Sequence, residues 1–211
     1  SGTDLAAANH VQTNIEIANV CGSGAMTHNT CGTPPVASFS ANATTVCDGA
    51  TVSFTDMSSN IPTSWAWTFT GGSPSSSSAQ NPSIVYNTPG TYPVTLVATN
   101  ATGSNTLTMS GYITVNANVT PVVNISLASG SNPMCTGAAA SFSATISNGG
   151  TTPSFQWKVN GSNAGTNSAV FSTSSLTNGQ AVTCILTSNA SCATTSTVSS
   201  SAITMTVNGS V

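Results

Sequence analysis

Charged side chains are nearly absent from this 211-residue chain: Lys and Arg together number 1, Asp and Glu together 4, and charged residues make up 2%. An ordinary soluble domain carries roughly a quarter charged residues. Without clustered Lys and Arg the chain cannot neutralise phosphates, which excludes nucleic-acid binding and a polybasic membrane patch. The formal net charge of −3 leaves little electrostatic repulsion between copies, so we expect self-association.

Carboxylates and imidazoles are missing from most of the chain, because no Asp, Glu or His follows Asp56. A carboxylate pair, a Ser-His-Asp triad or a His-based metal site therefore cannot be built within residues 57–211. Lys158 has no acid in its own stretch with which to form a cross-link, so we interpret it as a solvated strand residue. The sequence predicts that the protein is not an enzyme and has no catalytic residue or cofactor.

Long apolar runs are absent too. None approaches the roughly 18 residues that a membrane helix needs, so no membrane insertion is predicted. The chain is nevertheless 38% hydrophobic, which favours a folded protein over a disordered one. Its six cysteines suit an oxidising compartment, so we expect an extracellular or cell-surface location.

The cysteines allow more pairings than the sequence can decide among. A bond from Cys184 to Cys192 is plausible within one domain. Cys47 and Cys135 hold equivalent positions in two similar stretches, and each could bond the N-terminal segment of its own or a neighbouring chain, or remain a buried free thiol. The disulfide candidates are Cys21, Cys31, Cys47, Cys135, Cys184 and Cys192.

Metal binding has weak support near the N-terminus. Asp48 and Asp56 flank a strand and are weak calcium candidates. Zinc could take ligands from Cys21, Cys31, His10 and His28, but their spacing matches no standard pattern. A Cys21–Cys31 disulfide that staples a Gly/Asn-rich loop is the favoured interpretation, and no metal site is predicted.

Two shifts in composition divide the chain. Prolines at 34 and 35 end a Cys/Gly/Asn-rich extension, and residues 116–121 form a second linker. The stretch 47–54 (CDGATVSF) is repeated as 135–142 (CTGAAASF), about one domain length further on. We therefore expect an N-terminal extension and two β-sandwiches, with the bounds 1–35, 36–117 and 118–211.

Alternating apolar and small polar residues dominate both sandwiches, and Asn-Gly, Pro-Gly and Gly-Gly pairs separate the runs. Period-2 alternation with one apolar face indicates two sheets packed face to face. Residues 4–20 are the one helical candidate, and 11–17 could equally form a strand. The strongest strand predictions are 50–55, 92–98, 112–115, 141–146, 181–186 and 202–207.

The segment 36–115 closely resembles a PKD domain, an Ig-like β-sandwich. In this reading Trp67 and Phe69 lie two apart on one strand face and fill the core. The turn at Pro89 and Gly90 leads into the next core strand. The residues that carry the resemblance are 36–39, 49–56, 64–69, 81–82, 86–96 and 100–104.

The second sandwich, 121–207, resembles Ig-like modules found in tandem on large secreted bacterial surface proteins. The carrying stretches are 154–161, 176–180 and 182–189. Trp157, a core residue, and Cys184 match the strand C and strand F positions of an Ig sandwich, while Ala144 stands where the strand B cysteine is expected. The resemblance implies roles in attachment, adhesion or spacing.

The fold expected is thus all-β, with two tandem Ig-like sandwiches of PKD type and Ig type. The function expected is a non-catalytic extracellular structural or adhesive protein, a cell-surface or filament-forming subunit that assembles through residues 1–34 and uncharged surfaces. Surface glycans or other surface proteins are further candidate partners. The alternatives are a non-catalytic stalk of a secreted hydrolase, such as a metallopeptidase, and a carbohydrate-binding accessory module.

Overall fold

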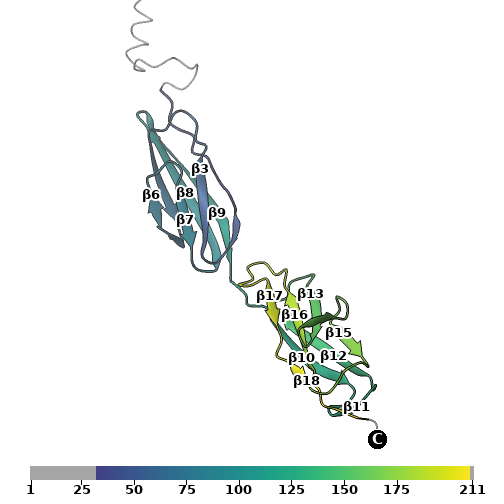
Figure 1. Cartoon of the computed structure of the whole chain (residues 1–211). Helices are drawn as coiled ribbons and strands as arrows, with labels where there is room; N and C mark the ends of the chain where they lie inside the picture. The colour runs from purple at the N-terminus through teal and green to yellow at the C-terminus, as the bar shows by residue number, and fades with distance from the viewer. Residues whose placement is uncertain (1–31, 210–211) are drawn as a thin grey trace, which may run out of the picture. The chain divides into compact units, whose positions relative to one another are not determined.

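The computed structural model describes residues 32–209, and these residues form strands and turns with no helix. No helix in this part of the chain is therefore long and apolar enough to span a membrane. The chain divides into two compact units, with the boundary between Asn116 and Ala117. Figure 1 colours the first from purple to teal and the second from teal-green to yellow. The fold is all-β, as the sequence predicts.

The first unit is a sandwich of two sheets. One sheet has four strands in the order β1-β3-β7-β5, and the other has five in the order β2-β9-β8-β4-β6. The strands are β1 Phe39–Ala41, β2 Thr45–Cys47, β3 Ala50–Asp56, β4 Ser64–Phe69, β5 Gly72–Ser73, β6 Ser76–Ser77, β7 Ser83–Tyr86, β8 Gly90–Asn100 and β9 Gly103–Asn116.

The core of the first unit follows the expected alternation. Along β3, Val52 and Phe54 are buried while their neighbours face solvent, and along β4 Trp67 and Phe69 are buried. Both strands therefore contribute one apolar face to the space between the sheets. The Trp67 and Phe69 rings stack with centroids 5.6 Å apart.

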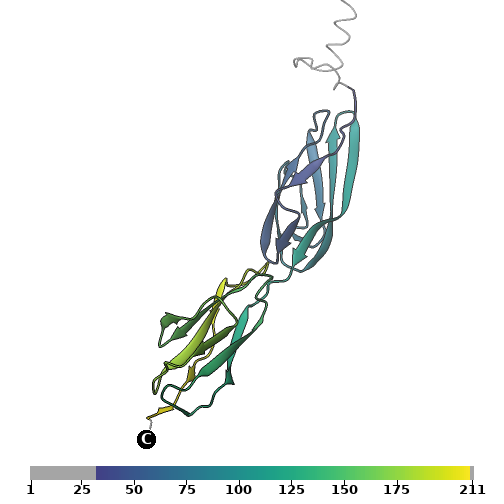
Figure 2. The ribbon, with the colours of Figure 1, turned by 90° about the vertical axis from the view of Figure 1, so that its right-hand side faces the viewer.

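The second unit has three sheets. They are β10-β12-β15, the pair β11-β19, and β14-β13-β16-β17, with β18 also paired to β16. The strands are β10 Val122–Ser129, β11 Met134–Cys135, β12 Ala140–Ser147, β13 Ser154–Val159, β14 Ser162–Ala164, β15 Val170–Thr173, β16 Ala181–Thr187, β17 Thr197–Ser199, β18 Ile203–Thr204 and β19 Val207–Asn208. Figure 2 shows the strands of each unit from a second direction.

Trp157 is the centre of the second core. It is fully buried on β13 and lies opposite Cys184 of β16 in the antiparallel register. The turn between β13 and β14 consists of Asn160 and Gly161, with φ of 49° and 81°. Positive φ at both central residues is what a two-residue hairpin requires, so this Asn-Gly pair joins the strands as its sequence indicates.

The end of the chain departs from the sequence prediction. Residues 202–207 were expected to form one strand, but β18 pairs with β16 whereas β19 pairs in parallel with β11. Between them Met205 is fully buried. The segment therefore changes sheets at Met205, which anchors the crossing in the core, and alternation alone does not reveal such a change of partner.

Candidate functional site

The Asp56 carboxylate, at the end of β3, accepts four hydrogen bonds. Its Oδ1 accepts hydrogen bonds from the backbone N–H of Ser58 at 3.0 Å and from the Ser58 hydroxyl at 2.6 Å. Its Oδ2 accepts from the indole N–H of Trp65 at 2.7 Å and from the Gln80 amide at 3.2 Å. The carboxylate thus joins the end of β3, the start of β4 and the segment that precedes β7.

The electrostatics of Asp56 favour its charged form. Burial alone would raise the pKa of this carboxyl, but the hydrogen bonds from Ser58, Gln80 and Trp65 outweigh burial and hold the pKa below 3.8. Each donor is a neutral group that stabilises the carboxylate and not the acid. The carboxylate therefore stays ionised at neutral pH and acts as a structural acceptor.

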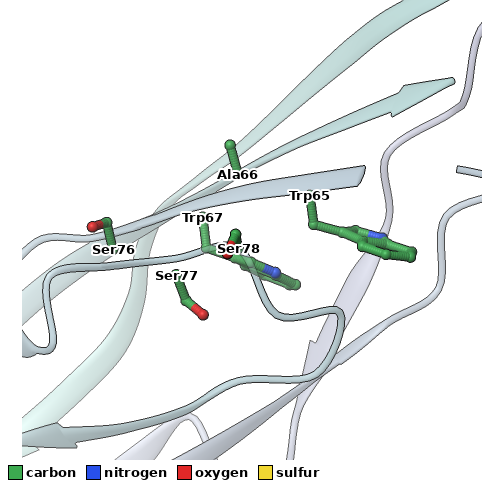
Figure 3. Close-up of a pocket in the computed structure, with 6 residues that line it drawn as sticks. All are labelled: Trp65, Ala66, Trp67, Ser76, Ser77 and Ser78. Atoms are coloured by element: carbon green, nitrogen blue, oxygen red, sulfur yellow. The ribbon is translucent and has the colours of Figure 1, made fainter. Parts of the chain in front are cut away.

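A shallow surface groove of about 580 Å³ lies beside this network. It is lined by Trp65, Ala66 and Trp67 of β4 and by residues 76–78, three consecutive serines on and after the edge strand β6. In Figure 3 the Trp65 and Trp67 side chains leave β4 on one side and Ala66 on the other. The groove combines an aromatic surface with hydroxyl groups and contains no titratable side chain.

The two tryptophans of the groove differ in accessibility. Trp67 is 1% exposed, and its indole N–H donates to the carbonyl of Ala79 at 2.9 Å. Trp65 is half-buried, and its N–H is engaged by Asp56. Trp65 is therefore the aromatic ring that a ligand in the groove could contact.

The calcium candidates Asp48 and Asp56 are not brought together. Asp48 lies two residues before the seven-residue strand β3 and Asp56 is the last residue of that strand, so the length of the strand, about 20 Å, separates them. The Asp56 oxygens already accept the hydrogen bonds described above. Within residues 32–209 no group of three or more His, Cys, Asp or Glu side chains could hold a metal ion. The zinc candidates Cys21, Cys31, His10 and His28 lie outside the described residues, as do the proposed Cys21–Cys31 disulfide and the predicted helix or strand of residues 4–20.

The pairing of the cysteines differs from the pairing considered in the sequence analysis. Cys47 and Cys192 are disulfide-bonded, whereas Cys135 and Cys184 carry free thiols. A Cys184–Cys192 bond is therefore wrong: Cys184 points into the core beside Trp157, and burial raises the pKa of its thiol to about 11. The suggestion that Cys135 could be a buried thiol is wrong as well, because it is exposed.

Sequence reasoning placed the core tryptophans but missed the groove and the Asp56 network. Trp67, Phe69 and Trp157 are all buried. Trp65, two residues before Trp67 on β4, packs against the same core but is only half-buried, because it lies at the start of the strand, where the sandwich ends. That position is the signal that could have marked it as accessible.

The family model for the PKD domain matches residues 32–115. No curated protein matches the chain. Among solved structures, the PKD1 domain of Vibrio anguillarum Epp is 32% identical, with 40% of this chain and 99% of that chain covered and a TM-score of 0.34.

Two multidomain structures align over more of the chain at lower identity. An I-band fragment of titin is 13% identical, with 84% of this chain and 66% of that chain covered and a TM-score of 0.46. The fibronectin(III)-like modules of Clostridium thermocellum CbhA are 15% identical, with 81% of this chain and 95% of that chain covered and a TM-score of 0.36.

Proposed function

Residues 32–115 belong to the PKD domain family, and from this premise we propose that the protein is a non-catalytic extracellular structural subunit that self-associates. PKD and Ig-like domains are typically non-catalytic modules of extracellular proteins, and disulfide-bonded cysteines suit an oxidising compartment. The finer role proposed is that of an adhesive or filament-forming subunit on the cell surface.

One observation carries this proposal: the described surface is almost free of charge. The charged side chains of residues 32–209 are Asp48, Asp56 and Lys158, and Asp56 is occupied by its hydrogen bonds. Natural sandwiches usually carry charged side chains, above all Lys, on their edge strands. These charges prevent the edges from pairing with the strands of another chain. With so few charges, the edges and faces of these units have little to oppose contact with another copy.

Exposed apolar side chains at one end of the first unit add support. Val36, Met57 and Ile61 are 57%, 60% and 65% exposed. They lie on neighbouring segments, since the Ser59 N–H donates to the carbonyl of Val36 at 3.1 Å. Ile61 has a φ of 51°, a left-handed conformation that is rare for a β-branched residue and is found mainly where function holds it. We propose that these three residues form an apolar contact surface.

The test is the oligomeric state of the full chain. Sedimentation velocity at low and high salt should show oligomers at both, because contacts made by hydrogen bonds and apolar burial are not screened. Deleting residues 1–31 should give monomers with an unchanged far-ultraviolet circular dichroism spectrum. This deletion spares Thr33 and Pro34, whose carbonyls accept hydrogen bonds from Asn100 and Asn60.

A variant with an intact N-terminus separates the contribution of the N-terminal segment from that of the apolar contact surface. Met57→Ser combined with Ile61→Asn removes apolar surface, and Asn tolerates the left-handed conformation at position 61. This variant should associate more weakly than the full chain. If the chain lacking residues 1–31 still forms oligomers, the N-terminal segment is not the contact; a full chain that is a single monomeric species favours the hydrolase-stalk alternative.

The groove beside Trp65 favours a second candidate function, the binding of surface glycans. A half-buried indole with neighbouring hydroxyl groups offers a sugar ring both an apolar face and hydrogen-bond partners. Binding to insoluble chitin, cellulose and peptidoglycan should fall roughly tenfold in Trp65→Ala. Trp65→Phe keeps the ring but loses the bond to Asp56, so it should retain most of the binding. Equal binding by the natural protein, Trp65→Ala and Trp65→Phe would exclude the groove as the glycan-binding site.

A further inference from the structure

Cys135 and Cys47 occupy the same position in the two units. In the first unit β2 pairs in parallel with the end of β9, which places Cys47 opposite Asn116. In the second unit β11 pairs in parallel with β19, which places Cys135 opposite Asn208. The repeated Cys-x-Gly-Ala sequence therefore forms the same structure twice, beside the last strand of each unit.

The hydrogen bonds around the two cysteines are equivalent as well. The N–H of Asp48 donates to the carbonyl of Asn116 at 2.9 Å, and the N–H of Thr136 donates to the carbonyl of Asn208 at 3.0 Å. These bonds fix the backbone on the C-terminal side of each cysteine.

The neighbour of Cys135 on its other side is held equally firmly. The Met134 N–H donates to the carbonyl of Thr206 at 2.9 Å, and the Met134 side chain is 4% exposed. Because successive strand residues point to opposite faces, burial of Met134 directs Cys135 outward. Backbone hydrogen bonds on both sides of Cys135 therefore fix the position from which its thiol is exposed to solvent.

The oxidation state of the two cysteines differs. Cys47 is disulfide-bonded, and residues 32–116 contain no second cysteine, so the partner of Cys47 lies outside these residues. This position in the repeated unit is therefore one that bonds a cysteine from beyond its own sandwich. Cys135 holds the same position with a free, exposed thiol.

Cys135 has no thiol to bond within its own unit. Cys184 is fully buried and Cys192 is already disulfide-bonded, and these are the other cysteines of residues 117–211. Lys158 is the one charged residue in that stretch, so two such units approach each other without electrostatic repulsion. We propose that Cys135 forms a disulfide with a cysteine of a second copy of this chain.

The chemistry is thiol–disulfide exchange with a small disulfide oxidant. A cysteine thiolate of one copy attacks oxidised glutathione, forms a mixed disulfide and releases one glutathione thiolate. The thiolate of Cys135 on the second copy then attacks the protein sulfur of the mixed disulfide, and a second glutathione thiolate leaves. The two protein thiols lose two electrons and two protons in total, and oxidised glutathione is reduced to two glutathione molecules.

This bond rests on the proposed self-association, which brings the copies together, but the two can fail separately. Full-length protein would be incubated with oxidised glutathione at pH 8, separated on a denaturing gel without reductant, and mapped by peptide mass spectrometry. We expect covalent species larger than the monomer with Cys135 at the junction. Cys135→Ser should abolish them, and Cys184→Ala, which removes the other free thiol of the second unit, should leave them unchanged.

Peptide mapping also identifies the cysteine on the second copy. A Cys135–Cys135 bond stops at the dimer, whereas a bond from Cys135 to Cys21 or Cys31 extends to longer ladders, and either supports the proposal. Recovery of Cys135 only as a free thiol or a glutathione adduct would overturn it, as would covalent species that persist in Cys135→Ser. Sedimentation of Cys135→Ser measures non-covalent association independently and so tests the proposed function alone.

Discussion

Replacing Trp67 by Ala should lower the free energy of unfolding of the first unit by about 3–5 kcal/mol, as large aromatic truncations in a core do. Trp67 is 1% exposed and lies among three other rings, with centroid distances of 5.2 Å to Phe39, 5.9 Å to Phe54 and 5.6 Å to Phe69. The substitution also leaves the carbonyl of Ala79 without its indole donor. The loss therefore combines a cavity with an unsatisfied acceptor.

Trp157→Ala is the matched variant for this measurement. Trp157 is fully buried, packs at centroid distances of 6.4 Å from Phe142 and 5.7 Å from Phe171, and donates to the carbonyl of Ser168 at 2.8 Å. Differential scanning calorimetry should show that each substitution lowers the midpoint temperature of unfolding of the unit that contains it. A change below about 1 kcal/mol in both variants would show that these tryptophans do not fill the cores.

The second large effect concerns Asp56. Asp56→Ala should destabilise the first unit by about 2–3 kcal/mol at neutral pH, because Ser58, Gln80 and the indole of Trp65 lose a charged acceptor. The folded-state pKa lies below 3.8, so the contribution is fully present above the pKa of the unfolded chain. It is lost as the pH falls through the lower, folded-state pKa.

The pH dependence distinguishes this carboxylate from a simple packing residue. The stability difference between the natural protein and Asp56→Asn, measured by urea unfolding, should be constant from pH 7 to about 5 and shrink below about pH 4. Asp48→Asn is the control, because it removes an acid from the same unit and leaves the Asp56 network intact. A difference that stays constant down to pH 2 would contradict the role of the ionised carboxylate.

The accuracy with which the sequence predicts each part of the fold depends on how far apart in the chain the interacting residues are. Alternation identified β3 and β16 to within one residue, because burial of one strand face is written locally as every second residue. The Asn160-Gly161 hairpin was equally local. In contrast, the division of residues 202–207 between two sheets depends on partners more than 60 residues away for β19, which no local pattern encodes.

The candidate site was predicted less well for the same reason. The Asp56 network joins residues from 58 to 80 through side-chain geometry at the ends of strands. The state of each cysteine depends equally on three-dimensional position, since Cys184 and Cys192 are near in sequence while one is enclosed in the core and the other is bonded. The repeat of Cys47 at Cys135, however, was visible in the sequence and holds in the strand register.

We propose that nearly uncharged β-sandwiches make this protein a self-associating structural subunit. Negative-stain electron microscopy of the purified full chain, at low and at high salt, tests this proposal. We expect ordered assemblies of repeating units that persist at high salt. A field of separate particles, each the size of one chain, under both conditions would contradict it.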